Sequence, residues 1–193
     1  MSLSSANDAA DVLRRLLEAL GRLGVRDVAL TGGVAFSTWV TPRYTRDFDL
    51  CGVVPEPSVD LILARFDGFR AGPARLPSII RFAFGGWDVD LFVAATDYDH
   101  ACLARAVQAD VGGTAVRVVS VEDLLIHKVT KLRSDKRKVL QDASDIRQLV
   151  DDSASGELDE FYLRKWLPER DAELLLRVPS LDDVELVTQL TAL

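Results

Sequence analysis

Two short segments alternate carboxylates with bulky apolar residues, and this alternation constrains the fold more than any other feature of the chain. The first is Asp47-Phe48-Asp49-Leu50, and the second is Trp87-Asp88-Val89-Asp90-Leu91-Phe92. A period of two is that of a β-strand with one buried face. Each segment is therefore predicted to be a strand that directs its acids to one side and its apolar residues to the core.

The rest of the pattern indicates a mixed α/β core followed by helices only. The predicted elements, by residue range, are helix 7–23, strand 25–31, helix 34–40, strand 47–53, helix 59–69, strands 79–84 and 87–93, helix 98–107, strand 115–119, and helices 120–132, 135–150, 157–166 and 181–193. Gly85-Gly86 is a hairpin signal, and Ser120 with Asp123 forms a capping box. We expect an α/β (α+β) fold whose mixed sheet is flanked by helices, with a core at 1–119 and a helical C-terminal region at 120–193 packed on the core.

Composition excludes several classes of function. A formal charge of −7 argues against wholesale electrostatic capture of nucleic acid. No apolar stretch approaches the roughly 20 residues that span a bilayer, so no membrane partner is expected. The N-terminus has no basic segment followed by an apolar one, which favours the cytoplasm. Cys51 and Cys102, with only His100 and His127 available, cannot assemble a zinc site and are predicted to be core residues.

The paired acids indicate metal chemistry. Residues i and i+2 of a strand project from one face about 6.5 to 7 Å apart, so Asp47 and Asp49 can reach one site. If the two acidic strands are neighbours, Asp88 and Asp90 converge there as well. Carboxylates that close require a cation, for which magnesium is suited, and two magnesium ions would form a clamp for phosphoryl transfer. The alternative is that the acids are only the exposed face of a half-buried strand.

A glycine pair, Gly32-Gly33, follows a predicted strand and opens a predicted helix. Missing side chains let backbone N–H groups and the helix N-terminus approach a triphosphate, although a plain tight turn is the alternative. Only thirteen residues, Val34–Arg46, separate this turn from Asp47, so both can face one ligand. Three phosphate-competent side chains precede that aspartate: Arg43, Thr45 and Arg46.

These motifs resemble those of a known superfamily. Leu30-Thr31-Gly32-Gly33 followed by Arg43–Leu50 is similar to the signature of the DNA polymerase β-like nucleotidyltransferases: a hydrophobic residue, Gly-Gly or Gly-Ser, a short helix and Asp-x-Asp. The Arg-x-Thr-x-Asp-x-Asp form resembles the abortive-infection (AbiEii-type) toxin nucleotidyltransferases and some small aminoglycoside nucleotidyltransferases. Val121–Lys128, then Arg137 and Asp142–Ile146, resembles the helical segment of the AbiEii-type proteins.

The resemblance implies roles for individual residues. It implies that Gly32, Gly33 and Ser37 contact the triphosphate, that Asp47 and Asp49 bind the metals, and that the third carboxylate is Asp90, with Asp88 as the alternative. It also implies that Lys128 is the family's lysine and that Asp145 orients it. Many members carry serine in place of the second glycine, so a hydroxyl contact to the terminal phosphate is lost unless Ser37 or Thr38 replaces it.

A basic cluster runs from Lys128 to Lys138. Most of it is predicted to be the solvated face of a long helix, paired with Asp142 and Asp135. Lys128 is the exception, because its apolar neighbours predict a buried stem whose ammonium reaches the cleft.

We therefore expect an enzyme that transfers a nucleoside monophosphate from a triphosphate such as ATP to an acceptor hydroxyl, with magnesium, releasing pyrophosphate. Asp90 could take the acceptor proton, and Lys128 could stabilise the transition state. The acceptor stays open between RNA, a protein and a small hydroxylated molecule. The family likeness favours a toxin with an antitoxin protein as partner. A small-molecule (aminoglycoside-like) nucleotidyltransferase and a catalytically silent binding module of the same fold are the alternatives. A metal-dependent glycosyltransferase is disfavoured, because Asp47 follows a single strand-helix unit.

Overall fold

The structure is a computed structural model that describes residues 3–40, 45, 47–70, 76–151 and 157–193. The chain divides into two compact units. The first contains the N-terminal residues up to Thr38 and the stretch that ends at Val119; the second contains Ser120–Leu193 and the short segment that starts at Trp39.

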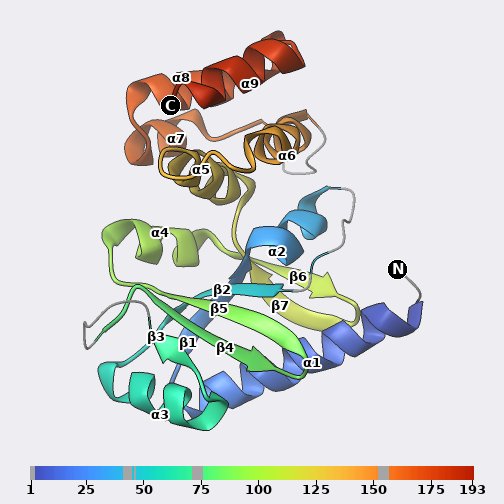
Figure 1. Cartoon of the computed structure of the whole chain (residues 1–193), viewed down its shortest axis with the longest axis vertical. Helices are drawn as coiled ribbons and strands as arrows, with labels where there is room; N and C mark the ends of the chain where they lie inside the picture. Colours follow the sequence, from blue (N-terminus) through green and yellow to red (C-terminus); the bar gives the residue numbers. More distant parts are fainter. Residues whose placement is uncertain (1–2, 41–44, 46, 71–75, 152–156) are drawn as a thin grey trace. The chain divides into compact units, whose positions relative to one another are not determined.

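The first unit combines one sheet with helices (Figure 1). Its elements are α1 (Leu3–Arg22), β1 (Arg26–Thr31), α2 (Gly32–Trp39), β2 (Asp47–Val53), α3 (Glu56–Phe66), β3 (Phe69–Arg70), β4 (Ile79–Phe84), β5 (Trp87–Val93), α4 (Asp97–Arg105), β6 (Val107–Val111) and β7 (Thr114–Val118). The seven strands lie in the order β3-β4-β5-β2-β1-β7-β6. The β2–β5 and β1–β7 pairs are parallel and the other pairs are antiparallel, which confirms the predicted mixed sheet.

The two faces of the sheet differ as the alternation predicts. Phe48 and Leu50 of β2 are buried, whereas Asp47 is exposed. Helix α3 covers the apolar face, since Phe66 stacks on Phe82 of β4 with ring centroids 4.8 Å apart. Helix α1 lies on the same side of the sheet as α3, and α4 packs against β1 and β2 from the other side (Figure 1).

The bounds of α3 differ from those of the helix predicted at 59–69. Helix α3 begins at Glu56 and holds Pro57 in its first turn, where a missing N–H costs no hydrogen bond, so this proline does not mark a loop. It ends at Phe66 because Asp67 adopts a left-handed conformation with φ 49°. The last residue of the predicted helix, Phe69, instead begins the short strand β3.

Strand β6 was missed by the sequence prediction. The helix predicted at 98–107 is α4, which ends at Arg105, and the chain then enters β6. Strands β6 and β7 pair antiparallel across Gly112-Gly113, whose φ values are 60° and 86°. This is the same Gly-Gly hairpin signal that predicts the β4–β5 turn correctly.

The second unit is helical, as predicted. Its elements are α5 (Val121–Leu132), α6 (Val139–Asp151), α7 (Glu160–Trp166), α8 (Glu169–Arg177), the 3-10 helix η1 (Val178–Ser180) and α9 (Asp183–Thr191). Helix α5 packs against α6 and α7, and α9 packs against α6. Ser120 caps α5 by accepting the N–H of Asp123 at 3.2 Å. The Asp123 carboxylate accepts from the Ser120 hydroxyl at 2.7 Å, so the return contact uses the side chain rather than the backbone.

Several helix bounds in the second unit differ from the prediction. The basic cluster does not lie on one long helix, because the chain leaves the helical conformation between Leu132 and Val139. Arg137 accordingly pairs with Asp135, two residues earlier, at 2.7 Å. The helix predicted from 157 begins at Glu160, where Asp159 caps it. Helix α8 was not predicted as a separate element.

Two further expectations concern burial and membranes. Cys51 and Cys102 are 5% and 1% exposed, which confirms them as core residues. Within the described residues, no helix combines the length and the apolar character needed to cross a bilayer.

Candidate active site

The glycine turn lies directly against the second acid of β2. Gly32 starts α2 with φ +60°, a conformation that L side chains rarely adopt. A Cβ at this position would lie 1.9 Å from Oδ2 of Asp49 and 2.5 Å from its Cγ. Glycine is therefore required here twice, by the backbone conformation and by the approach of the carboxylate. Residues 17 positions apart in the sequence thus meet at one point.

Thr45 joins this cluster from the segment that leads into β2. A Cβ on Gly33 would lie 3.0 Å from Oγ1 of Thr45. The Thr45 hydroxyl donates a hydrogen bond to Oδ1 of Asp47, whose side chain is exposed. The predicted phosphate-binding residues Arg43 and Arg46 lie outside the described residues. Gly33, Thr45 and the first acid are therefore neighbours in the structure.

The second acidic strand lies beside the first. Strands β2 and β5 are parallel neighbours in a register that pairs Asp47 with Asp88 and Asp49 with Asp90. Because paired residues of adjacent strands project from the same face, all four acids share one face of the sheet. Asp90 is next to the acid that touches the glycine turn, whereas Asp88 is next to the outer one.

Asp90 faces a cation that the sequence analysis did not single out. Nε of Arg81 lies 3.2 Å from Oδ1 and 3.3 Å from Oδ2 of Asp90. Arg81 is the cross-strand partner of Asp90 in the β4–β5 hairpin. A signal for this contact was present in the sequence: a two-residue Gly-Gly turn pairs Phe84 with Trp87, and counting outward pairs Arg81 with Asp90.

The acids of β2 match the protein ligands that magnesium commonly takes. Magnesium is commonly held by one or two protein carboxylates, with substrate phosphates and water as the other ligands. Asp47 and Asp49, beside the glycine turn, match that donor set. In the part of the chain that the structure describes, however, no three His, Cys, Asp or Glu side chains form a group that could hold a metal. The third ligand therefore stays a prediction, with Asp90 and Asp88 both open.

Ser37 lies one turn into α2, and its Oγ donates a hydrogen bond to the carbonyl oxygen of Gly33 at 3.0 Å. Thr38 makes the equivalent contact to Val34 at 3.2 Å. Both hydroxyls thus bond back to the helix that carries them. A role for Ser37 at the terminal phosphate stays a prediction.

The lysine and acid implied by the family resemblance contact one another within the second unit. Nζ of Lys128 lies 2.6 Å from Oδ2 of Asp145 and 3.1 Å from Oδ1 of Asp142. The two carboxylates are buried, and the Lys128 side chain is 14% exposed. Because Lys128 and Asp145 belong to the second unit, their predicted roles toward the acids of the first unit stay predictions.

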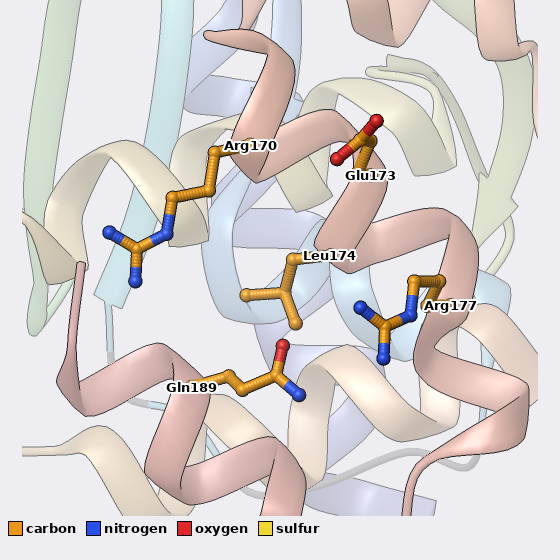
Figure 2. Close-up of a pocket in the computed structure, with 5 residues that line it drawn as sticks. All are labelled: Arg170, Glu173, Leu174, Arg177 and Gln189. Carbon is orange, nitrogen blue, oxygen red and sulfur yellow. The ribbon is translucent and has the colours of Figure 1, made fainter.

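Two hollows lie elsewhere on the chain. One, of about 170 Å³, lies on the second unit. Figure 2 shows that Arg170 and Arg177 of α8 lie on either side of Leu174, and that the side chain of Gln189 from α9 points toward Leu174. The other, of about 490 Å³, lies on the first unit and is lined by Glu56, Pro57, Asp60 and Arg70. Neither hollow is lined by a residue of the glycine turn or of the two acidic strands.

Comparisons with known proteins identify the fold and the family of the chain. Two solved structures share the fold: an antigenic nucleotidyltransferase-like protein from Paracoccidioides brasiliensis is 21% identical with a TM-score of 0.58, covering 98% of this chain and 94% of that one. The antibiotic-resistance factor ANT(2'')-Ia is 16% identical with a TM-score of 0.50, covering 97% and 91%. No curated protein sequence matches the chain.

A family model also matches residues 79–178, just over half of the chain, from β4 into the second unit. The glycine turn and the acids of β2 lie N-terminal to that match. The chain belongs to the family described as nucleotidyl transferase of unknown function, DUF2204.

Proposed function

We propose that this protein transfers a nucleoside monophosphate from a nucleoside triphosphate to an acceptor hydroxyl and releases pyrophosphate. The observation that carries the proposal is the contact between the glycine turn and the acidic strand, where a Cβ on Gly32 would collide with Asp49. A turn without side chains at the N-terminus of a helix suits an anion, and adjacent carboxylates suit the cation that accompanies a triphosphate. Nucleotidyl transfer needs both sites, one for the phosphates and one for the cation that accompanies them.

The residues divide into two sets in this proposal. Backbone N–H groups at the start of α2 bind the phosphates, with Thr45, Arg43 and Arg46 as predicted supporting groups. Asp47 and Asp49 hold magnesium, which when bound neutralises phosphate charge and lowers the pKa of the acceptor hydroxyl. The Thr45 hydroxyl orients the carboxylate of Asp47.

The reaction itself exchanges one phosphorus–oxygen bond for another. The acceptor oxygen forms a bond to the α-phosphorus, the bond from that phosphorus to the pyrophosphate oxygen breaks, and the acceptor proton goes to a carboxylate. Asp90 is the candidate for that proton, with Asp88 as the alternative. Lys128, oriented by Asp145, is proposed to stabilise the charge that develops, on the basis of the family resemblance.

In-line transfer places the acceptor opposite the pyrophosphate across the α-phosphorus. If the glycine turn holds the pyrophosphate side, the acceptor approaches over β5, β4 and β3. Phe69 of β3 is 59% exposed and Phe92 of β5 is 40% exposed, so both offer an apolar ring to an acceptor. The acceptor class stays open between RNA, a protein and a small molecule. A toxin role with an antitoxin partner is supported only by the AbiEii-type resemblance.

The test uses triphosphates labelled at either the α- or the γ-phosphate, with magnesium and with bulk RNA, cell lysate or an aminoglycoside as acceptor. Label from the α-position, and not from the γ-position, should reach the acceptor. An Asp47→Asn, Asp49→Asn double variant should lose at least about 100-fold in rate. Asp60→Asn, an exposed acid on α3, is the matched control and should keep full activity.

Two results would count against the proposal. Unaltered transfer in the double variant would remove the acids from the reaction. Calorimetric titration that shows no binding of any triphosphate, with or without magnesium, would favour the alternative of a catalytically silent binding module.

A further inference from the structure

A row of five side chains crosses the sheet on its acidic face. The strand registers pair Thr31 with Asp49, Asp49 with Asp90, Asp90 with Arg81, and Arg81 with Phe69. The row therefore runs from the strand that precedes the glycine turn to the edge strand β3. Arg81 is the cation of this row, and it stands between the acids and an exposed aromatic ring.

We propose that Arg81 is the resident counter-cation of Asp90, and that a divalent ion gains the Asp90 carboxylate only by displacing the Arg81 guanidinium. The inference rests on the proposed function, because it assumes that Asp47 and Asp49 bind the ion. It adds a residue that neither the family resemblance nor the sequence pattern assigns.

The geometry of the pair supports this exchange. One nitrogen, Nε of Arg81, is shared between the two oxygens of Asp90 at 3.2 and 3.3 Å. The guanidinium thus occupies the side of the carboxylate on which a cation would be held. Arginine keeps its charge at every accessible pH, so it repels an incoming divalent ion under all conditions.

The surrounding charges explain why a resident cation is useful. Asp47 pairs with Asp88 and Asp49 with Asp90, two positions further along the same neighbouring strands. Negative charges on neighbouring strands repel one another unless a positive charge compensates. Arg81 supplies such a charge at Asp90 before an ion binds.

Arg81 also has a second place to go. Its guanidinium carbon lies 6.0 Å from the centre of the Phe69 ring, within the range of a cation–π contact. The Arg81 side chain is 44% exposed, and that of Asp90 is 31% exposed. A displaced guanidinium can therefore move toward the ring without disturbing the core. The exchange would free the Asp90 oxygens, as ion ligand or proton acceptor, only in the loaded site.

The experiment measures the affinity of Mn²⁺ alone, from the free Mn²⁺ signal in electron paramagnetic resonance. Arg81→Met, which keeps the apolar stem and removes the charge, should bind Mn²⁺ about two- to fivefold more tightly than the wild type, the range expected for removing a partly exposed ion pair. In the Asp90→Asn background the same substitution should give a smaller gain, because only the general repulsion between Arg81 and the ion is then removed. Arg70→Met is the matched control. Arg70 lies on the neighbouring strand β3 and pairs at 3.0 Å with Asp60 of α3 rather than with an acid of the site.

Equal Mn²⁺ affinities in wild type and Arg81→Met would overturn the proposal, as would an equal gain in the Asp90→Asn background. A second measurement does not depend on the variants' affinities. The Nε–H resonance of Arg81, assigned by its loss in Arg81→Met, should shift when the wild type is saturated with Mg²⁺. A resonance that stays in place would show that the guanidinium is not displaced.

The two proposals fail in different ways. Transfer of α-label together with unchanged Mn²⁺ affinity in Arg81→Met would leave the proposed function standing and remove the exchange. If Arg81→Met binds Mn²⁺ more tightly but the wild type transfers no label, the exchange would stand and the proposed function would be removed. A wild type that binds no Mn²⁺ at all would contradict both.

Discussion

The four carboxylates on the acidic face of the sheet and a set of four carboxylates in the second unit differ in their access to water. On the sheet, Asp47 and Asp88 are exposed, and Asp49 and Asp90 are partly buried. Four acids of the second unit are almost fully buried, and each contacts a donor: Asp123 with Tyr162 and Ser120, Asp142 and Asp145 with Lys128, and Asp171 with Arg133.

This difference separates two uses of the same side chain. Burying a charge costs free energy unless a partner compensates, so these four buried acids serve the stability of the second unit. The acids on the sheet keep their contact with solvent, and a ligand can therefore reach them. Exposure beside the glycine turn, rather than the number of acids, distinguishes the candidate site.

The largest expected effect is a loss of stability when Lys128, the partner of the buried acids Asp142 and Asp145, is replaced. Lys128→Met leaves Asp142 and Asp145 without this cation and should lower the free energy of unfolding by about 3 to 5 kcal/mol, measured by urea denaturation. Lys131→Met is the control on the same helix, since Lys131 is exposed, and should change stability by about 0.5 kcal/mol or less. Equal effects of the two substitutions would contradict a stabilising role of Lys128 toward the two buried acids. Transfer by folded Lys128→Met tests the proposed catalytic role separately.

The glycine turn supplies the next largest effect. Gly32→Ala forces Asp49 to move and should reduce nucleotide transfer by about 100-fold, since a displacement of about 1 Å can cost that much in rate. Gly86→Ala is the matched control. Gly86 has φ +84° but nothing within 4 Å of its Cβ position, so its substitution should cost about 1 to 2 kcal/mol of stability and leave the transfer rate intact. Similar transfer rates in the two variants would show that the contact between Gly32 and Asp49 does not matter for transfer.

A smaller effect is expected at Tyr162. Its hydroxyl donates to Oδ1 of Asp123 at 2.8 Å, and Asp123 has no exposed surface. Tyr162→Phe removes a hydrogen bond to a buried acid and should lower the free energy of unfolding by about 1.5 to 3 kcal/mol. Urea denaturation measures this change, and a cost below about 0.5 kcal/mol would show that Asp123 is satisfied without Tyr162.

The smallest effect is a pH dependence at the surface. The side-chain hydrogen bond from Arg137 lowers the pKa of Asp135 below its ordinary value of about 4. A lowered pKa in the folded protein stabilises it above the unfolded pKa, and that contribution is lost as the pH falls through the folded pKa. Asp135→Asn should therefore be slightly less stable than the wild type at neutral pH, with the difference vanishing in acid. Carbon NMR titration of Asp135 with a midpoint at or above about 4 would contradict the pairing.

Local patterns predicted the strands of the site well. The bounds predicted for β2, β4 and β5 coincide with those observed, because alternation and a Gly-Gly turn are properties of adjacent residues. The prediction missed β6 and the start of α3, although signals for both were present in the Gly112-Gly113 turn and in Pro57. It also did not find Arg81, because counting the hairpin register was needed to place that residue opposite Asp90.

By itself, the sequence determined that acids lie on one face of two strands, that glycines open a helix and that the last third of the chain is helical. These properties follow from side-chain period and backbone preference, which depend only on neighbours in the chain. The tertiary structure alone decided that β2 lies beside β5, which pairs Asp49 with Asp90, and that Gly32 lies against Asp49. Those contacts join residues far apart in the sequence, and they depend on which strands pair to bury the apolar face of the sheet.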